Sequence, residues 1–333
     1  MSLPPVEIPL GAMRFNSDSQ KLEYWNGQIW MQVHTFSPDL NGGARGLFGG
    51  GTPGINTIEY ITISTAGNGT DFGDLTVARA ELASCSSSTR GVWWGGTSPT
   101  INVIDYVTIS STGNAQDFGD LPDNKKEIAA CSNETRGLCA GGGGGNMNTI
   151  HYITIASTGN SGDFGDLIYG TAGSNITCTQ SPTRGLFQNR NEPSGSKQID
   201  YVTIGSMGNA SDFGDSTDAR YGAASMVCSS TRGIFAGGYA PGITNLIDYV
   251  TIASLGDAVN FGDLTQAGYM MCGCSSSIRG VIGARGIYPA GVSNIMDYIT
   301  IATQGDAVDF GDSATTAGKQ AAAGCSNAHG GLG

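Results

Sequence analysis

The sequence predicts an all-β fold built from a repeated unit, and three observations support this prediction. The tetrapeptide Asp-Phe-Gly-Asp, once with Asn in first place, occurs six times at intervals of 46, 46, 49, 48 and 49 residues. The apolar segments between its copies are 4 to 8 residues long and end at Gly, Asn or Ser, which is too short for helices and typical of strands. Glycine makes up 53 of the 333 residues and only 13% are charged, as suits short strands joined by turns.

Asp-Phe-Gly also holds magnesium in protein kinases, so its first copy at residues 71–73 raises the question of a kinase. The chain lacks the Gly-rich loop, the Val-Ala-Ile-Lys strand and the His-Arg-Asp loop that a kinase needs around this triplet. A catalytic metal ligand is needed once, whereas this triplet recurs along the chain. We therefore interpret it as part of a structural repeat.

Each unit of about 48 residues contains four strand-like segments, which is typical of a β-propeller blade. The first unit begins at its second strand, residues 45–51, and the chain ends with a first strand at residues 319–326. Six copies of each strand are then present, so the last strand has to complete the blade that residues 45–51 begin. We therefore predict a six-bladed β-propeller over residues 45–333, closed by its C-terminal strand, which removes open sheet edges.

The repeat resembles kelch repeats in three features. An apolar strand runs into a glycine pair, as at residues 49–50, and the next strand carries a tyrosine, as at Tyr60. Two units depart from the pair, with Gln-Asn at residues 188–189 and Gly-Ala at residues 283–284. The resemblance covers residues 45–333 and implies kelch-like four-stranded blades. Its third feature is an aromatic residue of the apolar layer, usually Trp in kelch repeats and here Phe72, Phe118, Phe164, Phe213, Phe261 and Phe310.

Each second strand starts with Arg-Gly, and every unit also contains several acidic residues. We expect these arginines to form hydrogen-bonded ion pairs within or between blades. The alternative is a central ring of Arg that binds an anion, but a charge that recurs in every blade is usually structural. The recurrent arginines are Arg90, Arg136, Arg184, Arg232 and Arg279.

Six cysteines share one position a few residues before the next Arg-Gly. A ring of blades holds equivalent positions apart, so these cysteines are poorly placed to pair with one another. We expect small, buried, unpaired thiols. The six are Cys85, Cys131, Cys178, Cys228, Cys274 and Cys325.

An Asn or Asp follows Gly in the turn before each tetrapeptide, as in Gly67-Asn68. This pattern predicts a tight turn with positive φ at the Asn. We expect Asp71 and Asp74 to fasten the turn as hydrogen-bond acceptors. The unit lacks the dense acidic loop that supplies the 6 to 8 oxygen ligands of Ca²⁺.

The connections within the units differ in how much they vary. Those between strands one and two and between three and four share one face of a propeller and hardly change, whereas the others change in length and chemistry, from "GTPGIN" to "QNRNEPSGSK". Loops that differ on a repeated scaffold usually carry recognition, and aromatic rings with Arg and Asn suit a sugar or a protein epitope. The candidate contacts on this variable face are Tyr169, Tyr221, Tyr239, Tyr269, Tyr288, Asn189, Arg190, Asn191 and Arg285.

Charge and motif content exclude several classes of function. A net charge of −12, from 28 acidic and 16 basic residues, argues against nucleic acid or anionic lipid as the main partner. No apolar run approaches the roughly 18 residues of a membrane span, and "MSLPPVEIPL" lacks the features of a signal peptide. The three histidines are scattered and nothing singles out a pair of carboxylates, so we expect no catalytic site, metal or cofactor.

Residues 1–37 form a separate unit, followed by a linker at residues 38–44. Its three alternating segments are separated by "NSDSQ" and by Asn26-Gly27, the strongest signal for a two-residue hairpin turn, which predicts a three-stranded meander. So small a sheet cannot bury both faces alone and should dock on a partner. The expected attachment residues are Phe15, Tyr24, Trp25, Trp30 and Met31.

This segment resembles the short "R-Y-N-…-E-x-Y-N-G-x-x-W" modules of bacteriophage tail-fibre and other virion proteins. The "YITI…TGN…DFGDL" repeat likewise resembles repeats in structural proteins of marine tailed phages. Both resemblances imply a virion protein that is assembled in the host cytoplasm. The module is matched here by Arg14, Phe15, Asn16, Glu23, Trp25, Asn26, Gly27 and Trp30.

The resemblances and the two faces together lead to an expected function. The N-terminal unit joins the propeller on its uniform face, so the variable face should point away from the anchor. We expect a tail fibre or fibre-like appendage that binds other virion proteins through its N-terminus, forms a homo-oligomer and displays the propeller to a host-surface glycan or protein. A structural adaptor or a decoration protein of capsid or tail is the first alternative, and a polysaccharide-degrading enzyme is the second.

Overall fold

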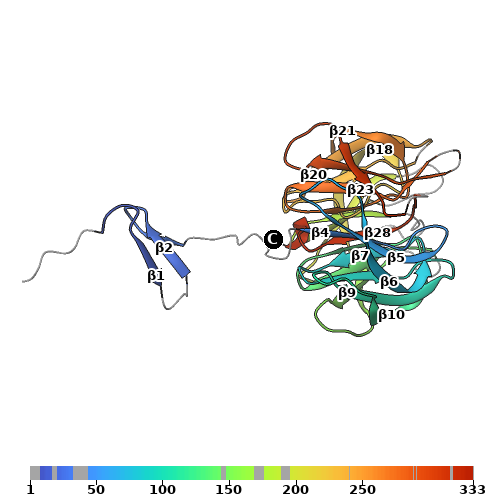
Figure 1. Cartoon of the computed structure of the whole chain (residues 1–333), viewed down its shortest axis with the longest axis horizontal. Helices are drawn as coiled ribbons and strands as arrows, with labels where there is room; N and C mark the ends of the chain where they lie inside the picture. Colours follow the sequence, from blue (N-terminus) through green and yellow to red (C-terminus); the bar gives the residue numbers. More distant parts are fainter. Residues whose placement is uncertain are drawn as a thin grey trace, which may run out of the picture. The chain divides into compact units, whose positions relative to one another are not determined.

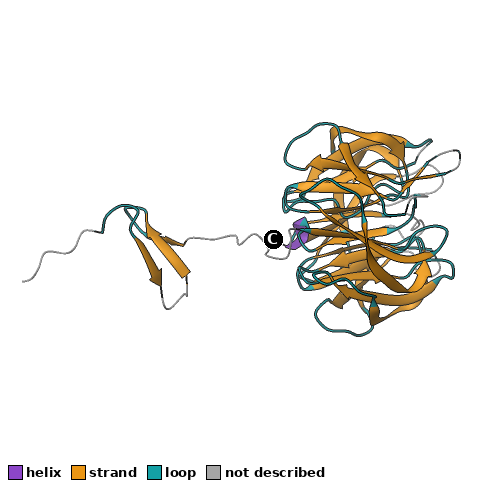
Figure 2. Ribbon diagram, viewed as in Figure 1, coloured by secondary structure: helices purple, strands orange, loops and turns teal. Residues whose placement is uncertain are grey.

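The computed structural model describes residues 8–16, 21–32, 44–143, 148–168, 176–188, 196–239, 241–287, 289, 291–315 and 318–332. The chain divides into two compact units, Met1–Asn41 and Gly42–Gly333 (Figure 1). Within the described residues the regular structure is strand, apart from one short 3₁₀ helix, η1 (Gly330–Leu332) (Figure 2). The prediction of an all-β fold is therefore confirmed.

The smaller unit contains a three-stranded antiparallel sheet, in the order β1 (Met13–Asn16), β2 (Lys21–Trp25) and β3 (Trp30–Gln32). Trp25 pairs with Trp30, so four residues connect β2 and β3. The Asn26 side-chain oxygen accepts the amides of the second and third residues after it, at 2.9 and 2.8 Å. The three predicted strands are present, but the predicted two-residue turn at Asn26-Gly27 is wrong, because this side chain organises a longer loop.

The larger unit contains antiparallel repeat sheets, numbered here 1 to 6 along the chain. Repeat sheet 1 is ordered β28 (Ala323–Ser326), β4 (Arg45–Gly49), β5 (Ile55–Thr62), β6 (Thr70–Arg79). Repeat sheet 2 is ordered β7 (Ala83–Ser86), β8 (Arg90–Trp94), β9 (Ile101–Thr108), β10 (Gln116–Lys125). Repeat sheet 3 is ordered β11 (Ala129–Ser132), β12 (Arg136–Ala140), β13 (Thr149–Thr154), β14 (Gly162–Asp166).

The remaining three sheets follow the same plan. Repeat sheet 4 is ordered β15 (Thr177–Gln180), β16 (Arg184–Gln188), β17 (Ser196–Thr203), β18 (Ser211–Arg220). Repeat sheet 5 has β19 (Arg232–Ala236), β20 (Thr244–Thr251) and β21 (Val259–Gly268), and its first strand is reduced to isolated bridges at Ala224 and Cys228. Repeat sheet 6 is ordered β22 (Cys272–Ser275), β23 (Arg279–Gly283), β26 (Ile295–Thr300), β27 (Val308–Asp312), and a hairpin of β24 (Arg285–Gly286) and β25 (Val292–Ser293) joins β23 to β26.

The last strand of the larger unit pairs with its first. In repeat sheet 1, β28 lies antiparallel to β4, with Ala323 opposite Gly49 and Ser326 opposite Gly46. Figure 1 shows the two strands side by side although they come from opposite ends of the unit. The predicted pairing of the C-terminal strand with residues 45–51 is confirmed.

The Phe-Gly-Asp segment of each sheet hydrogen-bonds to the Gly-Asn or Gly-Asp turn of the next sheet; we call this contact the clasp. Between repeat sheets 1 and 2, the Gly113 amide donates to the Phe72 carbonyl at 2.8 Å. The Asp74 amide donates to the Asn114 side-chain oxygen at 3.1 Å. The same amide-to-Phe bond recurs at every junction, from Gly159 to Phe118, Gly208 to Phe164, Gly256 to Phe213, Gly305 to Phe261 and Gly67 to Phe310.

The clasp corrects two expectations about the turn. Positive φ belongs to Gly67 and not to the Asn68 that follows it. Asn68 instead accepts the Asp312 amide at 3.0 Å with its side-chain oxygen. Asp74 is the residue of repeat sheet 1 that corresponds to Asp312. Its backbone makes the clasp bonds, whereas its carboxylate had been expected to make them.

The recurrent arginines also join neighbouring sheets, but through carbonyl groups. The Arg90 guanidinium donates to the Ile155 carbonyl of the next sheet at 2.9 Å and lies 4.7 Å from the ring centre of Tyr106 in its own sheet. Arg136, Arg184, Arg232 and Arg279 make the same two contacts. Within the described part of the chain these arginines form no ion pair, so the expectation of ion pairs is wrong there. Each guanidinium instead stacks on a Tyr ring and donates to a carbonyl group.

The apolar layer forms as predicted from the recurrent phenylalanines. Each of the six is buried, and Phe72 meets the edge of Tyr60 with ring centres 6.1 Å apart. All eight cysteines are free and buried, as expected. The prediction that six of them share one repeat position is wrong in repeat sheets 4 and 5. In sheet 4, Thr179 and not Cys178 lies opposite Leu186. In sheet 5, Val227 takes the position where a Cys was expected, and its carbonyl accepts the Ile234 amide.

Candidate functional site

The connections that vary between repeats join the second strand of a sheet to its third strand, or the fourth strand to the next sheet. We call the end of the larger unit that carries these connections the loop end. Of the nine residues expected to contact a ligand there, Tyr221, Tyr239, Tyr269 and Arg285 belong to the described residues. Tyr169, Tyr288, Asn189, Arg190 and Asn191 lie outside them.

Three of the predicted tyrosines form a continuous row. Tyr221 follows β18, Tyr239 follows β19 and Tyr269 follows β21. The ring centres are 5.5 Å apart for the first pair and 5.9 Å apart for Tyr239 and Tyr269, with tilted planes. Backbone bonds of 3.2 and 2.9 Å hold Tyr221 against Tyr239. The three tyrosines are half-buried, so part of each residue remains accessible at the loop end.

Arg285 does not join this row. Its side chain is fully buried, and its guanidinium bonds to the Asp297 carboxylate at 2.6 Å. It occupies the space that a side chain on Gly268 would need. The expectation that Arg285 contacts a ligand is therefore wrong. It instead holds the β24–β25 hairpin beside the tyrosine row, where Tyr269 bridges to Gly286.

Buried ion pairs cross the junctions between sheets near the loop end. Arg79 at the end of β6 bonds to Asp105 on β9 at 2.8 Å, and neither side chain is exposed. Arg220 pairs with Asp248 in the same way, and Lys319 pairs with Glu59 at 2.8 Å. These pairs were not expected from the sequence, although a residue with an acidic side chain stands directly before the recurrent Tyr in five of the six repeats.

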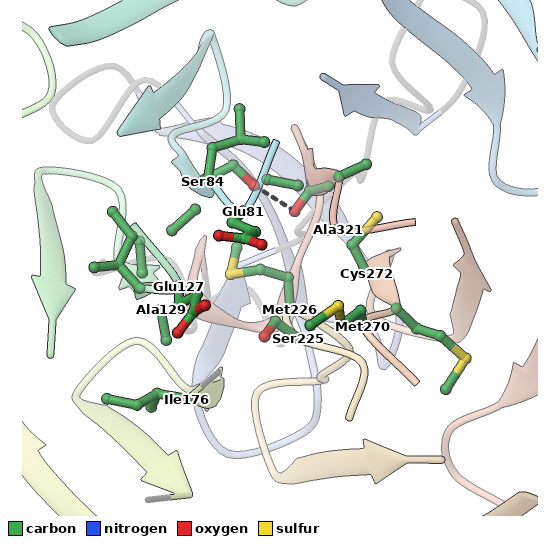
Figure 3. Close-up of a pocket in the computed structure, with 18 of the residues that line it drawn as sticks. Glu81, Ser84, Glu127, Ala129, Ile176, Ser225, Met226, Met270, Cys272 and Ala321 are labelled. Atoms are coloured by element: carbon green, nitrogen blue, oxygen red, sulfur yellow. Dashed lines mark hydrogen bonds between the residues drawn. The ribbon is translucent and has the colours of Figure 1, made fainter. Parts of the chain in front are cut away.

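A cavity of about 60 Å³ lies where the starts of the first strands meet. Glu81, Glu127, Met226 and Met270 are among the residues around it (Figure 3). Met270 directly follows a tyrosine of the row, so the row and the cavity share a chain segment. Glu81 and Glu127 adopt φ of 54° and 56°, an uncommon conformation for residues with a side chain.

Backbone hydrogen bonds arrange these residues around the cavity. The Glu127 amide donates to the Glu81 carbonyl, the Glu81 amide to Ala321 and the Ala321 amide to Met270, each at 2.8 Å. Burial, and secondly the nearby Glu127 carboxylate, raise the pKa of Glu81. The Lys126 ammonium lies 3.6 Å from Glu81 and 3.3 Å from Glu127, which offsets part of that repulsion.

At the opposite end, His329 links the C-terminal segment to repeat sheets 2 and 4. Its Nδ1 lies 3.0 Å from the Gln180 amide nitrogen and accepts the Gly331 amide at 3.0 Å. Its Nε2 therefore carries the proton and donates to the Ser86 carbonyl at 3.0 Å. Gly330 approaches the backbone of Ser229 so closely that a side chain would not fit. Burial lowers the pKa of His329 to about 4.

This buried neutral histidine predicts acid sensitivity. Above pH 6.5 the ring is neutral in both states, but as the pH falls towards 4 the unfolded chain takes up a proton that the folded chain excludes. The free energy of unfolding should fall by about 1.4 kcal/mol per pH unit, or about 3 kcal/mol over this range. Urea unfolding of the wild type and His329→Gln between these pH values measures the difference. Equal pH dependence of the two proteins would contradict the assignment.

The N-terminal attachment candidates lie on two faces of the small sheet. Phe15, Tyr24 and Met31 share one face, and their exposed fractions are 66%, 39% and 39%. Trp25 and Trp30 pack against each other on the other face, where Arg14 lies 4.1 Å from the Trp30 ring centre. Only the first face is therefore an uncovered apolar surface.

The described residues contain no group of three or more His, Cys, Asp or Glu side chains that could hold a metal ion. No helix in the described part is long and apolar enough to cross a membrane.

No protein-family model matches the chain, and no curated protein sequence matches it.

Proposed function

We propose that the six repeat sheets close into a six-bladed, kelch-like β-propeller. The clasp supports this arrangement, because it links sheet 1 to sheet 2 and continues to a final bond from Gly67 in sheet 1 to Phe310 in sheet 6. The arginine contacts run in the same order, and Arg279 of sheet 6 donates to the Ile63 carbonyl of sheet 1 at 3.1 Å. Each sheet would then serve as one blade.

We further propose that the protein is a virion structural protein, a tail fibre or similar appendage, whose propeller binds a host-surface glycan. The observation that carries the proposal is the tyrosine row at the loop end. Tyr221, Tyr239 and Tyr269 come from two different sheets and meet only because the fold brings their connections together. Turns at the opposite end are engaged in the clasp, so variation there would disturb the junctions, whereas the loop end is free to vary.

The chemistry of the row suits a carbohydrate. Tyrosine rings pack on the apolar faces of sugar rings, and their hydroxyls exchange hydrogen bonds with sugar hydroxyls. The exposed face with Phe15 would bind the virion or a second copy of the chain.

Replacement of the central tyrosine tests the recognition role. Tyr239→Ala should weaken glycan binding by at least about tenfold, because it removes the ring that contacts both others. Glycan-array and host-cell binding by the full chain measure the effect. The matched control is Met207→Ala, which changes an exposed side chain at the end of the larger unit where the clasps lie, here called the clasp end. This variant should bind the glycan as well as the wild type does. Thermal unfolding of each variant verifies folding.

A structural adaptor is the second candidate, and a specific surface favours it. Met207, Leu255 and Ile278 are 62%, 56% and 66% exposed at the clasp end. Apolar side chains at such positions suit contacts with neighbouring subunits. Absence of binding to any glycan or host cell, together with a fixed copy number on purified particles, would overturn the recognition role and support the adaptor.

A further inference from the structure

The junction between repeat sheets 2 and 3 differs from the others at its buried polar position. In repeat sheets 1, 2, 4, 5 and 6 the residue before the recurrent Tyr is acidic. In repeat sheet 3 this residue is His151. The basic residue that faces this position in other junctions is retained here as Lys125. Lys125 ends β10 as Arg79 ends β6, and each of them is paired in its sheet with the Ile that starts the preceding strand.

Both side chains are enclosed at this junction. Lys125 is 1% exposed and His151 is 5% exposed. Neither ring nitrogen of His151 makes a hydrogen bond of standard geometry within the described residues, although the Gly162 backbone acts on the ring as a hydrogen-bonding group. Lys125 donates to the Gly141 carbonyl at 3.3 Å. Burial of an imidazole that is so weakly hydrogen-bonded is costly, and a second cation there would be costlier still.

The neighbouring residue is also exceptional. Cys139 lies opposite His151 on the adjacent strand. The same position holds Trp93 in repeat sheet 2 and Phe187 in repeat sheet 4, each opposite the acidic residue of its sheet. Among these three sheets, only the one with the histidine has a small thiol in place of a large aromatic ring. Less apolar packing is therefore available to hold this junction closed.

The surroundings of His151 oppose its protonation, chiefly through burial. Burial lowers the pKa of His151, and Lys125 lowers it further, whereas Asp163, Asp123 and the hydrogen-bonding Gly162 backbone act in the opposite direction. Above the ordinary value of 6.5 the ring is neutral whether the junction is closed or open. Below it the opened junction takes up a proton that the closed one excludes, so acid favours opening.

We propose that the junction between repeat sheets 2 and 3 is an acid-sensitive opening point of the larger unit. Protonated His151 beside Lys125 places two cations in a site where Arg79–Asp105, Arg220–Asp248, Arg285–Asp297 and Lys319–Glu59 form ion pairs elsewhere. Mild acid therefore separates β10 from β13 before it separates the equivalent strands of the other junctions.

Hydrogen exchange of the full chain, read peptide by peptide, tests this proposal. Exchange in β13 and β10, corrected for the intrinsic effect of pH, should be about tenfold faster at about pH 5 than at about pH 7.5. Strands β6 and β9 form the matched junction with an ion pair, and their corrected exchange should change less than threefold. A uniform change across all junctions would overturn the proposal.

Two substitutions separate His151 from other acid effects. His151→Asp restores the acid found in the other sheets and should abolish the local acceleration, because it can pair with Lys125. His151→Asn removes the titrating group with a similar shape, and should also abolish it if the first variant fails to fold. His329→Gln should leave the acceleration at β13 intact. Retention of the acceleration in His151→Asn would overturn the proposal.

Discussion

Deletion of residues 322–333 is expected to abolish soluble expression of the protein. The deletion removes β28, whose backbone pairs with β4 and which also contacts β7 and β22. It leaves the edge of β4 open, and open edges recruit other chains. It also removes His329 and its bonds to Ser86 and Gln180. The combined loss should be comparable to the about 5–15 kcal/mol that keeps a domain folded.

Fractionation of expressed protein, followed by thermal unfolding of any soluble material, measures this effect. Deletion of residues 1–41 removes more of the chain but none of the larger unit. It should leave the larger unit soluble, with a melting temperature within about 3 °C of the full chain. A peptide of residues 319–333 supplied during refolding should recover part of the truncated protein. A soluble truncated protein with cooperative unfolding would show that β28 is dispensable.

Substitution of a single clasp glycine should produce the largest effect of any point change considered. A side chain on Gly73 would collide with the Gly113 carbonyl of the next sheet, in a backbone with φ of 147°. Gly73→Ala must therefore open the clasp or distort both turns. We expect it to lower the free energy of unfolding by about 3–4 kcal/mol. Urea unfolding monitored by fluorescence measures the change.

Gly113 supplies a matched control from the same clasp. Its φ is 155°, close to that of Gly73, but a side chain there would have no neighbour within 4 Å. Gly113→Ala should therefore cost only the backbone strain, about 1–2 kcal/mol. The difference between the two variants isolates the collision. Equal effects would mean that backbone strain alone explains both.

The repeat pattern was predictable because its causes are local. Strand length, alternation and turn residues lie within a few positions of one another, so the sheets and the pairing of the last strand with residues 45–51 could be inferred from spacing. The tyrosine row was predictable in part, since variable loops of adjacent repeats are neighbours in any repeated scaffold. Its geometry was not, because it depends on how three connections fold over one another.

The polar interior was harder to infer because its partners come from different repeats. Arg79 and Asp105 are buried together only after two sheets have packed. Arg285 belongs to a variable loop and was expected at the surface, but the absence of a side chain on Gly268 gives it a buried place in the neighbouring sheet. The conformations of Glu81 and Glu127 likewise arise from the crowding of first strands, which spacing along the chain does not report.

The pairing of β28 with β4 also has a consequence for the timing of synthesis. Ala323 and Gly49 pair across almost the whole length of the larger unit. A ribosome that adds roughly 5–20 residues per second needs on the order of tens of seconds to make the intervening chain. During that interval β4 has no partner on one edge, and this edge stays unprotected until β28 has been made. Conditions that slow translation should therefore increase aggregation of this protein more than conditions that slow folding after release.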